Sequence, residues 1–232
     1  MKFFGCLTVL LSVAVGPRCV ANLLTNPDFQ VDDYAVGVVN IYDQWGWDPA
    51  TIVSAERGLT PHSGTRMLRI DGTSLNPNGD GTGGTPYQFV SLLPYAALVD
   101  AGELQLRASY YANRVAGDSE TDTEFVLTLR AYIGDVSQQN TPEFGKSGTS
   151  LMSDSDPSTW EKISLTWQVP AGTDYLGILP YPVENVHNDI FGSGQEFDGH
   201  YIDSVTLEVI PEPGVFALWI VGLAVLRRFL QR

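Results

Sequence analysis

Hydrophobic and polar residues alternate with a period of two along four stretches of the chain. These stretches are GELQLRASYY (102–111), EFVLTLRAYIG (124–134), TWEKISLTWQVP (159–170) and HYIDSVTLEVI (200–210). In the first of them Leu104, Leu106 and Ala108 alternate with polar neighbours. Because successive side chains of a strand point to opposite faces of a sheet, the pattern predicts antiparallel strands with one buried face.

Turn-forming residues separate these stretches. Clusters rich in Gly, Asn and Asp, such as NPNGDGTGG (76–84) and GSGQEFDG (192–199), lie between them, and we find no long amphipathic helical pattern and no internal repeat. Many short strands with such turns predict an all-β fold, an antiparallel β-sandwich or jelly roll. In the last stretch, Tyr201, Asp203 and Val205 fall on the face that we expect to be buried.

The N-terminal end carries the features of a secretory signal. Lys2 is followed by an apolar stretch from Phe3 to Val15, and the small residues Cys19 and Ala21 stand two apart, as a signal peptidase site prefers. We therefore expect residues 1–21 to be a signal peptide that is removed after export.

The C-terminal end is a short apolar segment. Residues 214–226 carry no charge, and three arginines follow them. A helix of this length covers about 20 Å, less than the ~30 Å hydrocarbon core of a bilayer. The segment predicts a short transmembrane helix that associates only transiently with the inner membrane, with its arginines on the cytoplasmic side. The remaining residues, 22–210, have the length of one domain.

This middle segment is acidic and contains no cysteine. Both cysteines, Cys6 and Cys19, lie in the expected signal peptide, so the mature chain has no thiol for disulfides. Eight of the 13 Lys and Arg residues and 26 of the 27 Asp and Glu residues lie within 22–210, which gives a formal charge of about −18. Such a surface repels nucleic acid, so we expect no nucleic-acid partner. It favours divalent cations, or serves solubility alone.

The residues at the C-terminal end match a known sorting signal. Pro211, Glu212 and Pro213 precede the apolar segment, and Arg227 and Arg228 follow it. This arrangement resembles the PEP-CTERM signal of Gram-negative bacteria. The resemblance implies that residues 211–232 are a sorting tail read by an exosortase-type membrane protease. It also implies export through the inner membrane to the cell surface or an extracellular, polysaccharide-rich matrix.

The middle segment resembles another known group. Its motifs are NLLTNPDFQ (22–30), HSGTRMLRIDG (62–72), STWEKISLTWQVPAGTDYLGI (158–178) and FDGHYIDSVTLEVI (197–210). Their order is similar to that of galactose-binding-like jelly rolls, which include many carbohydrate-binding modules. The resemblance implies a jelly-roll domain over residues 22–210 that binds polysaccharide.

The same resemblance implies a structural Ca²⁺. A carboxylate on a buried strand face, as expected for Asp203, needs a cation or several hydrogen-bond donors. In the resembling families this aspartate binds Ca²⁺ together with a carboxylate from the opening strand and oxygens near a Ser-Gly turn, which corresponds here to Ser63. Gln30 stands where those families have glutamate, so Asp28, Asp32 or the Gln30 amide oxygen would have to complete the oxygen ligands. Without the ion, backbone amides, an arginine or water would satisfy Asp203.

Aromatic residues in IYDQWGWDPA (41–50) are the candidates for sugar binding. Tyr42, Trp45 and Trp47 offer ring faces, and Asp48 offers a carboxylate for sugar hydroxyls. The alternative is that one or both tryptophans fill the core.

We find none of the motifs that we associate with a hydrolase. The chain has three histidines, no Gly-x-Ser-x-Gly elbow and no His-Glu-x-x-His helix. We therefore expect a non-catalytic, exported protein that binds polysaccharide. The alternatives are a structural matrix domain without a sugar site and, less favoured, a glycoside hydrolase.

Overall fold

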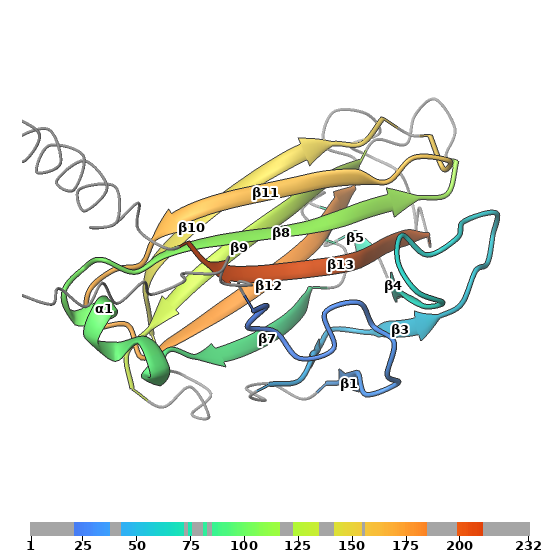
Figure 1. The fold of residues 1–232 in the computed structure, drawn as a ribbon. Coiled ribbons are helices and arrows are strands. Elements are labelled where there is room, and N and C mark those ends of the chain that lie inside the picture. The colour runs from blue at the N-terminus through green and yellow to red at the C-terminus, as the bar shows by residue number, and fades with distance from the viewer. Residues whose placement is uncertain are drawn as a thin grey trace, which may run out of the picture.

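Two packed β-sheets form the body of the chain in the computed structural model (Figure 1). The structure describes residues 21–37, 43–71, 74–75, 81–82, 85–116, 123–134, 142–154, 156–184 and 199–210. The expected signal peptide, except Ala21, and the whole expected sorting tail lie outside these residues. Among the described residues, no helix is long and apolar enough to cross a membrane.

One sheet has six strands in the described part of the chain. Their spatial order is β1 (Ala35–Val36), β2 (Gly46–Trp47), β7 (Pro86–Ser91), β12 (Tyr175–Glu184), β9 (Thr123–Tyr132) and β10 (Glu143–Met152). Only the β1–β2 pair within this sheet is parallel, and the other neighbours are antiparallel.

The other sheet has five described strands, all paired antiparallel. Their order is β11 (Glu161–Gln168), β8 (Gln105–Arg114), β13 (His200–Val209), β4 (Met67–Ile70) and β3 (Ala50–Val53). From β7 to β13 the chain changes sheet at every step except β9–β10, as in a jelly roll. A short hairpin of β5 (Ser74–Leu75) and β6 (Gly81–Thr82), a 3₁₀ turn η1 (Leu93–Tyr95) and the helix α1 (Ala96–Asp100) complete the elements.

The core lies between the sheets and follows the predicted alternation. Side chains that alternate along β8 and β9 are fully buried, namely Leu106, Ala108, Tyr110, Phe125, Leu127 and Leu129. Trp167 on β11 packs against this core, and Trp160 packs against a smaller cluster around Met67 and Tyr201, so both contribute to packing. Ile133 continues the alternation of Phe125, Leu127 and Leu129 in the sequence, but it is exposed because β9 ends at Tyr132.

The predicted face of Asp203 is wrong, because a β-bulge puts its side chain on the opposite side of the sheet from Val205. The pairing of β13 with β8 shifts register between Asp203 and Thr206, and Ser204 has a φ of 52°. A bulge inserts one extra residue, so side chains before and after it change faces. Val205 points into the core, whereas Asp203 and Tyr201 lie on the outward side of the sheet. Asp203 is nonetheless fully buried, because Ser63 and its neighbours lie over it.

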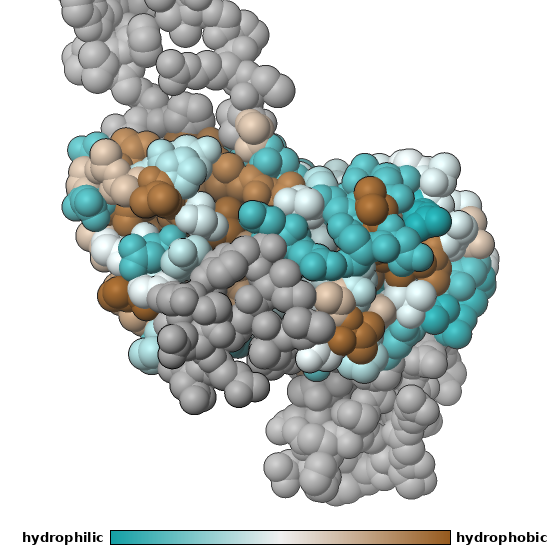
Figure 2. All heavy atoms as spheres, turned by 90° about the horizontal axis from the view of Figure 1, so that it is seen from below, coloured by the Kyte–Doolittle hydropathy of each residue, from teal (hydrophilic) through white to brown (hydrophobic). Residues whose placement is uncertain are grey.

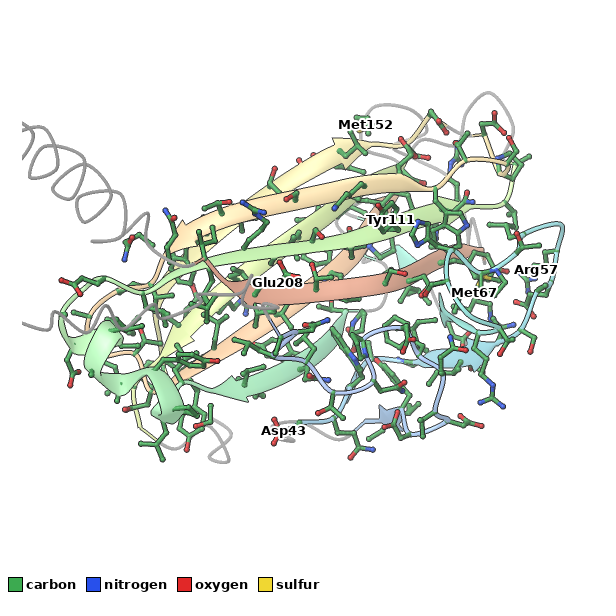
Figure 3. The ribbon with its side chains drawn as sticks, viewed as in Figure 1. Asp43, Arg57, Met67, Tyr111, Met152 and Glu208 are labelled. Carbon is green, nitrogen blue, oxygen red and sulfur yellow. The ribbon has the colours of Figure 1, made fainter. Side chains whose placement is uncertain are left out.

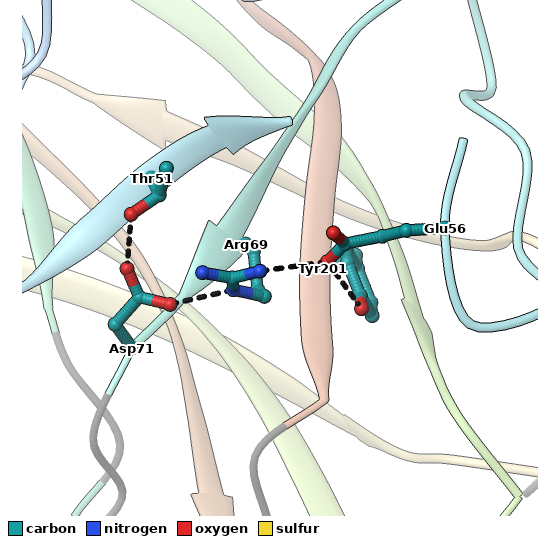
Figure 4. Close-up of polar contacts among 5 residues, drawn as sticks. All are labelled: Thr51, Glu56, Arg69, Asp71 and Tyr201. Atoms are coloured by element: carbon teal, nitrogen blue, oxygen red, sulfur yellow. Dashed lines mark hydrogen bonds and ion pairs between the residues drawn. The ribbon is translucent and has the colours of Figure 1, made fainter. Parts of the chain in front are cut away.

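A charged network covers the neighbouring part of the same outward face (Figure 4). Arg69 Nη1 donates to Glu56 Oε1 at 2.9 Å, and its Nε donates to Asp71 Oδ1 at 2.6 Å. Tyr201 Oη donates to the same Glu56 oxygen at 3.0 Å, and Thr51 Oγ1 donates to Asp71. The network ties β3, β4 and β13 to the loop that contains Glu56.

Candidate functional site

The structure places the predicted sugar-binding residues in different environments. Trp45 is 0% exposed and packs in the core against Phe29, with ring centroids 5.5 Å apart. Its face cannot reach a ligand in this conformation, so the sugar-binding role predicted for Trp45 is wrong and the core alternative holds for it. Asp48 accepts a hydrogen bond from Thr85 N at 2.9 Å. Tyr42 and the side chain of Trp47 lie outside the described residues.

A different aromatic cluster occupies the outward face of the six-stranded sheet. We call its four rings, Tyr87, Phe89, Tyr132 and Tyr175, the aromatic cluster. They come from β7, β9 and β12, and the registers Tyr175↔Ser91, Tyr175↔Tyr132 and Gly177↔Phe89 bring them together. Their inward neighbours Val90, Ala131 and Leu176 are in or beside the core, so the period of two along each strand puts these rings on the other face.

The rings of the cluster hold one another in place. Tyr87 and Phe89 have centroids 4.5 Å apart, and Phe89 meets Tyr132 edge-on at 5.4 Å. The hydroxyls of Tyr87 and Tyr132 are 2.5 Å apart and share a hydrogen bond. Burial, followed by the neighbouring Tyr132, raises the pKa of Tyr87 far above its ordinary value, so that hydroxyl stays neutral. Phe89 and Tyr132 are almost fully buried, whereas Tyr87 and Tyr175 are partly exposed.

Gly177 makes room for this arrangement. A Cβ atom at that position would lie 2.2 Å from Tyr87 Oη and 2.5 Å from two ring carbons of Tyr87. The Tyr87 ring therefore lies across the backbone of β12. Beside it, Arg130 pairs with Gly177 in register and makes an ion pair with Glu143, with Nε and Oε2 3.2 Å apart.

A pocket of about 290 Å³ opens next to the aromatic cluster and shares Tyr175 with it. Its described lining comes from the end of β7, from η1 and α1, and from the turns before β10 and β12; these residues are Ser91, Leu92, Leu93, Ala96, Val99, Asp100, Gly134, Thr173, Asp174 and Tyr175. Leu92 and Val99 form an apolar floor, and Ser91, Asp100 and Asp174 supply polar groups.

Backbone hydrogen bonds fix the Asp174 side of this pocket. Asp174 N donates to Tyr132 O at 2.9 Å, and Asp174 O accepts from Leu92 N at 2.9 Å. The Asp174 carboxylate accepts from Gly134 N through Oδ2 at 2.7 Å, which orients it while its side chain remains exposed. In the view from below, hydrophobic atoms gather at the left-hand end, where η1 and α1 lie (Figure 2). Leu93, in η1, is 79% exposed.

The residues predicted to bind Ca²⁺ lie close together at the opposite end of the sandwich. Asp203 Oδ2 accepts from Ser63 N at 3.0 Å, and Asp203 Oδ1 accepts from Ser204 N at 2.6 Å. Burial raises the pKa of Asp203 to about 6, and the nearby charge of Asp28 adds to the rise, although the backbone amides oppose it. Gln30 bonds to the same turn, through Thr65.

These residues, as arranged, do not suit Ca²⁺. The ion takes six to eight oxygen ligands, but the Gln30 side chain turns its nitrogen, Nε2, toward two carbonyl oxygens of this region. Both Asp203 oxygens already accept backbone amides. Among the described residues, no group of three or more His, Cys, Asp or Glu side chains is placed to hold a metal ion. Calcium binding at these residues stays a prediction.

Another aromatic group borders Asp203 on the outward face of the five-stranded sheet. His62 stacks on Tyr111 with centroids 3.6 Å apart, and Trp160 meets His62 edge-on at 6.0 Å. Lys162 Nζ lies 5.5 Å from the Tyr111 ring centroid. Figure 3 labels Tyr111 on β8 and Glu208 on β13, the strands toward the viewer. His62 covers one face of Tyr111, while His62 itself is exposed and Tyr111 and Trp160 are half-buried.

Comparisons with known proteins show a similarity of fold only. No protein-family model matches the chain, and no curated protein matches it by sequence. Among solved structures, TmCBM61 in complex with β-1,4-galactotriose has a TM-score of 0.48 and 14% identity, covering 82% of this chain and 99% of that chain. The CBM22-1 xylan-binding domain of Paenibacillus barcinonensis Xyn10C has a TM-score of 0.48 and 12% identity, covering 82% and 96%. A CBM4 module has a TM-score of 0.44 and 13% identity, covering 81% and 99%.

Proposed function

We propose that residues 22–210 form a non-catalytic module of the galactose-binding-like kind that binds polysaccharide at the aromatic cluster and the adjoining pocket. The observation that supports the proposal is the shared position of Tyr175, whose ring belongs to the cluster and also lines the pocket. Sugar rings pack their C–H faces on aromatic rings, and their hydroxyls bond to a few fixed polar groups in a largely apolar pocket. The site has both kinds of group side by side.

Each side chain has a distinct part in this proposal. Tyr175 and Tyr87 present partly exposed rings to the sugar, while Phe89 and Tyr132 support them from below. The Asp174 carboxylate, held by Gly134 N, accepts hydrogen bonds from sugar hydroxyls. The pocket volume of about 290 Å³ lies just below the range of roughly 300–1,000 Å³ typical of ligand sites, so we expect it to hold no more than a short stretch of a polysaccharide.

Affinity gel electrophoresis tests this proposal with galactan, xylan and mixed-linkage β-glucan cast separately into native gels. We expect at least one of these polysaccharides to retard the protein. Tyr175→Ala should weaken that retardation about tenfold, equivalent to ~1.4 kcal/mol. Tyr111→Ala, which removes a half-buried tyrosine from the opposite sheet, is the matched control and should leave it unchanged. No retardation in any gel, or equal losses in the two variants, would contradict the proposal.

The second candidate is a structural module that contacts other proteins of a matrix. The observation that favours it is the exposure of Leu93 and Leu98 beside the pocket, since exposed apolar side chains that gather on a surface mark protein contacts. Light scattering coupled to gel filtration separates the two candidates. A mass that rises with protein concentration, together with no retardation by polysaccharide, would favour the structural module. Release of reducing ends from the same polysaccharides would instead revive a glycoside hydrolase.

We also propose that the domain is exported and sorted by its C-terminal tail. The support is in the sequence: the signal-like residues 1–21 and the tail from Pro211 to Arg232 with its PEP-CTERM resemblance. Expression in a Gram-negative host that has an exosortase-type protease tests this proposal. We expect mass spectrometry of the surface or medium fraction to find a chain that begins at residue 22 and lacks the apolar tail. Full-length protein confined to the cytoplasm would refute export.

A further inference from the structure

The Gln30 side chain joins the opening segment of the domain to the turn at residues 62–66. Its Nε2 donates to Asp28 O at 2.7 Å and to Arg66 O at 3.2 Å. Its Oε1 accepts from Thr65 N at 2.9 Å and from Thr65 Oγ1 at 3.2 Å. We call this set of four hydrogen bonds the Gln30 clasp.

The partners fix which way the amide points. A backbone N–H can only donate, so Thr65 N requires the oxygen of the Gln30 amide. Backbone carbonyls can only accept, so Asp28 O and Arg66 O require its nitrogen. An amide rotated by half a turn would set oxygen against both carbonyls and nitrogen against the Thr65 N–H. The nitrogen therefore belongs at the point where the two carbonyl oxygens converge.

The turn is shaped to receive this side chain. A Cβ on Gly64 would lie 2.5–2.6 Å from Cδ, Oε1 and Nε2 of Gln30, and Gly64 has a φ of +61°, which favours glycine. Next to the clasp, Asp203 is held by the backbone amides of Ser63 and Ser204. Asp28 lies close enough for its charge to affect Asp203.

The geometry points to the Gln30 amide taking the place of a cation: its two N–H groups neutralise the converging carbonyls, so the domain closes this end without Ca²⁺. The same geometry implies a latent site. A glutamate at position 30 has no N–H groups and would set a negative charge against two carbonyl oxygens, with the carboxylates of Asp28 and Asp203 nearby. That set of hard oxygen ligands suits Ca²⁺, so Gln30→Glu should make folding depend on the ion.

Thermal unfolding of the whole domain at fixed neutral pH, in excess EDTA and in excess CaCl₂, tests this inference. We expect the Tm of the unaltered protein to be the same in both. Gln30→Glu should unfold roughly 5 °C or more below it in EDTA and recover in CaCl₂. Gln30→Ala should lose a similar amount in both solutions, since it provides neither N–H groups nor charge.

Gln44→Glu is the matched control. Gln44 is also partly buried and donates through Nε2 to the backbone carbonyl of Asp33. It should show no response to CaCl₂. A fall in the Tm of the unaltered protein in EDTA would overturn the inference, as would a Gln30→Glu protein that ignores Ca²⁺. If Gln30→Glu does not fold in either solution, two measurements on the unaltered protein still decide: its Tm with and without EDTA, and its calcium content by inductively coupled plasma mass spectrometry. Bound calcium would overturn the inference. A protein without calcium whose Tm is unchanged by EDTA would support it.

Discussion

Replacing Gly177 by alanine tests whether the aromatic cluster depends on a bare backbone in β12. The three nearest atoms to an added Cβ all belong to Tyr87, at 2.2–2.5 Å. Real Cβ atoms do not approach other atoms so closely, so the Tyr87 ring has to swing away from β12. That movement separates it from Phe89 and breaks the hydrogen bond between the Tyr87 and Tyr132 hydroxyls.

The size of the effect follows from two opposing contributions. Overpacking at a well-packed site costs about 1–3 kcal/mol. For a domain of this length that corresponds to a fall in Tm of roughly 2–12 °C. In a Tyr87→Ala background the obstructing ring is gone, and alanine is favoured over glycine in a strand by about 0.5–1 kcal/mol. The same Gly177→Ala change should therefore stabilise the Tyr87→Ala protein, and the coupling energy between the two positions should be about 1.5–4 kcal/mol.

Urea unfolding of the four proteins in this double-mutant cycle measures the coupling. Gly148→Ala, in β10, is the control, since an added Cβ there would have only ordinary contacts of 3.4 Å with Leu127 O and Thr128 Oγ1. Since nothing obstructs the added methyl group, it should raise the free energy of unfolding by about 0.5–1 kcal/mol, the preference of a strand for alanine over glycine. Additive effects of Gly177→Ala and Tyr87→Ala would show that Tyr87 is not the obstacle and would refute the reasoning.

Two further predictions concern the core. Trp45→Ala removes a fully buried ring that packs on Phe29, and it should cost about 3–5 kcal/mol in urea unfolding; a loss below 1 kcal/mol would contradict the core position. Burial, aided by Arg114, lowers the pKa of His200 from 6.5 to about 3. The unfolded chain therefore takes up a proton first, and His200 makes stability fall as the pH drops from about 6.5 to about 3, by at most ~1.4 kcal/mol per pH unit. Asp203, whose pKa is raised, has the opposite effect on stability between its ordinary range and about pH 6. The test therefore compares the pH dependence of the free energy of unfolding in the unaltered protein and in His200→Gln, which should lose less stability on acidification. Parallel curves of stability against pH for the two proteins would refute this account.

Strand positions could be predicted from the sequence because burial imposes a period of two. Leu106 and Phe125 are buried where the alternation placed them, and their strands pair in antiparallel sheets. The prediction failed where backbone conformation breaks the period. Ser204, with its φ of 52°, turns Asp203 to the outward side, and nothing in HYIDSVTLEVI signals that bulge.

The candidate site was harder to predict because its parts meet only in the sheet. Tyr87, Tyr132 and Tyr175 are separated by more than forty residues from one another along the chain, and no short motif contains two of them. Each strand's alternation does assign them to one face. That face becomes an aromatic surface only because β12 lies between β7 and β9, and because a glycine at position 177 gives Tyr87 its place. Trp45 and Trp47 were candidates for sugar binding because they lie two residues apart in the sequence, but that spacing does not determine whether their rings are exposed.

The proposed sugar site and the Gln30 clasp lie in different parts of the sandwich, so the proposals about polysaccharide binding and about stability without Ca²⁺ can be tested independently. The pocket is lined by residues of η1 and α1, whereas the Gln30 clasp joins the opening segment to the turn before β4. The elements α1 and β4 lie toward opposite ends of the sandwich (Figure 1). Among the described residues the two sets have no residue in common, and the effects of substitutions at distant, independent sites add. A calcium-loaded Gln30→Glu protein should therefore be retarded by polysaccharide like the unaltered protein, and Tyr175→Ala should keep an EDTA-insensitive Tm. A Gln30→Glu protein that is fully folded in CaCl₂ but has lost retardation would show that the opening segment also shapes the site.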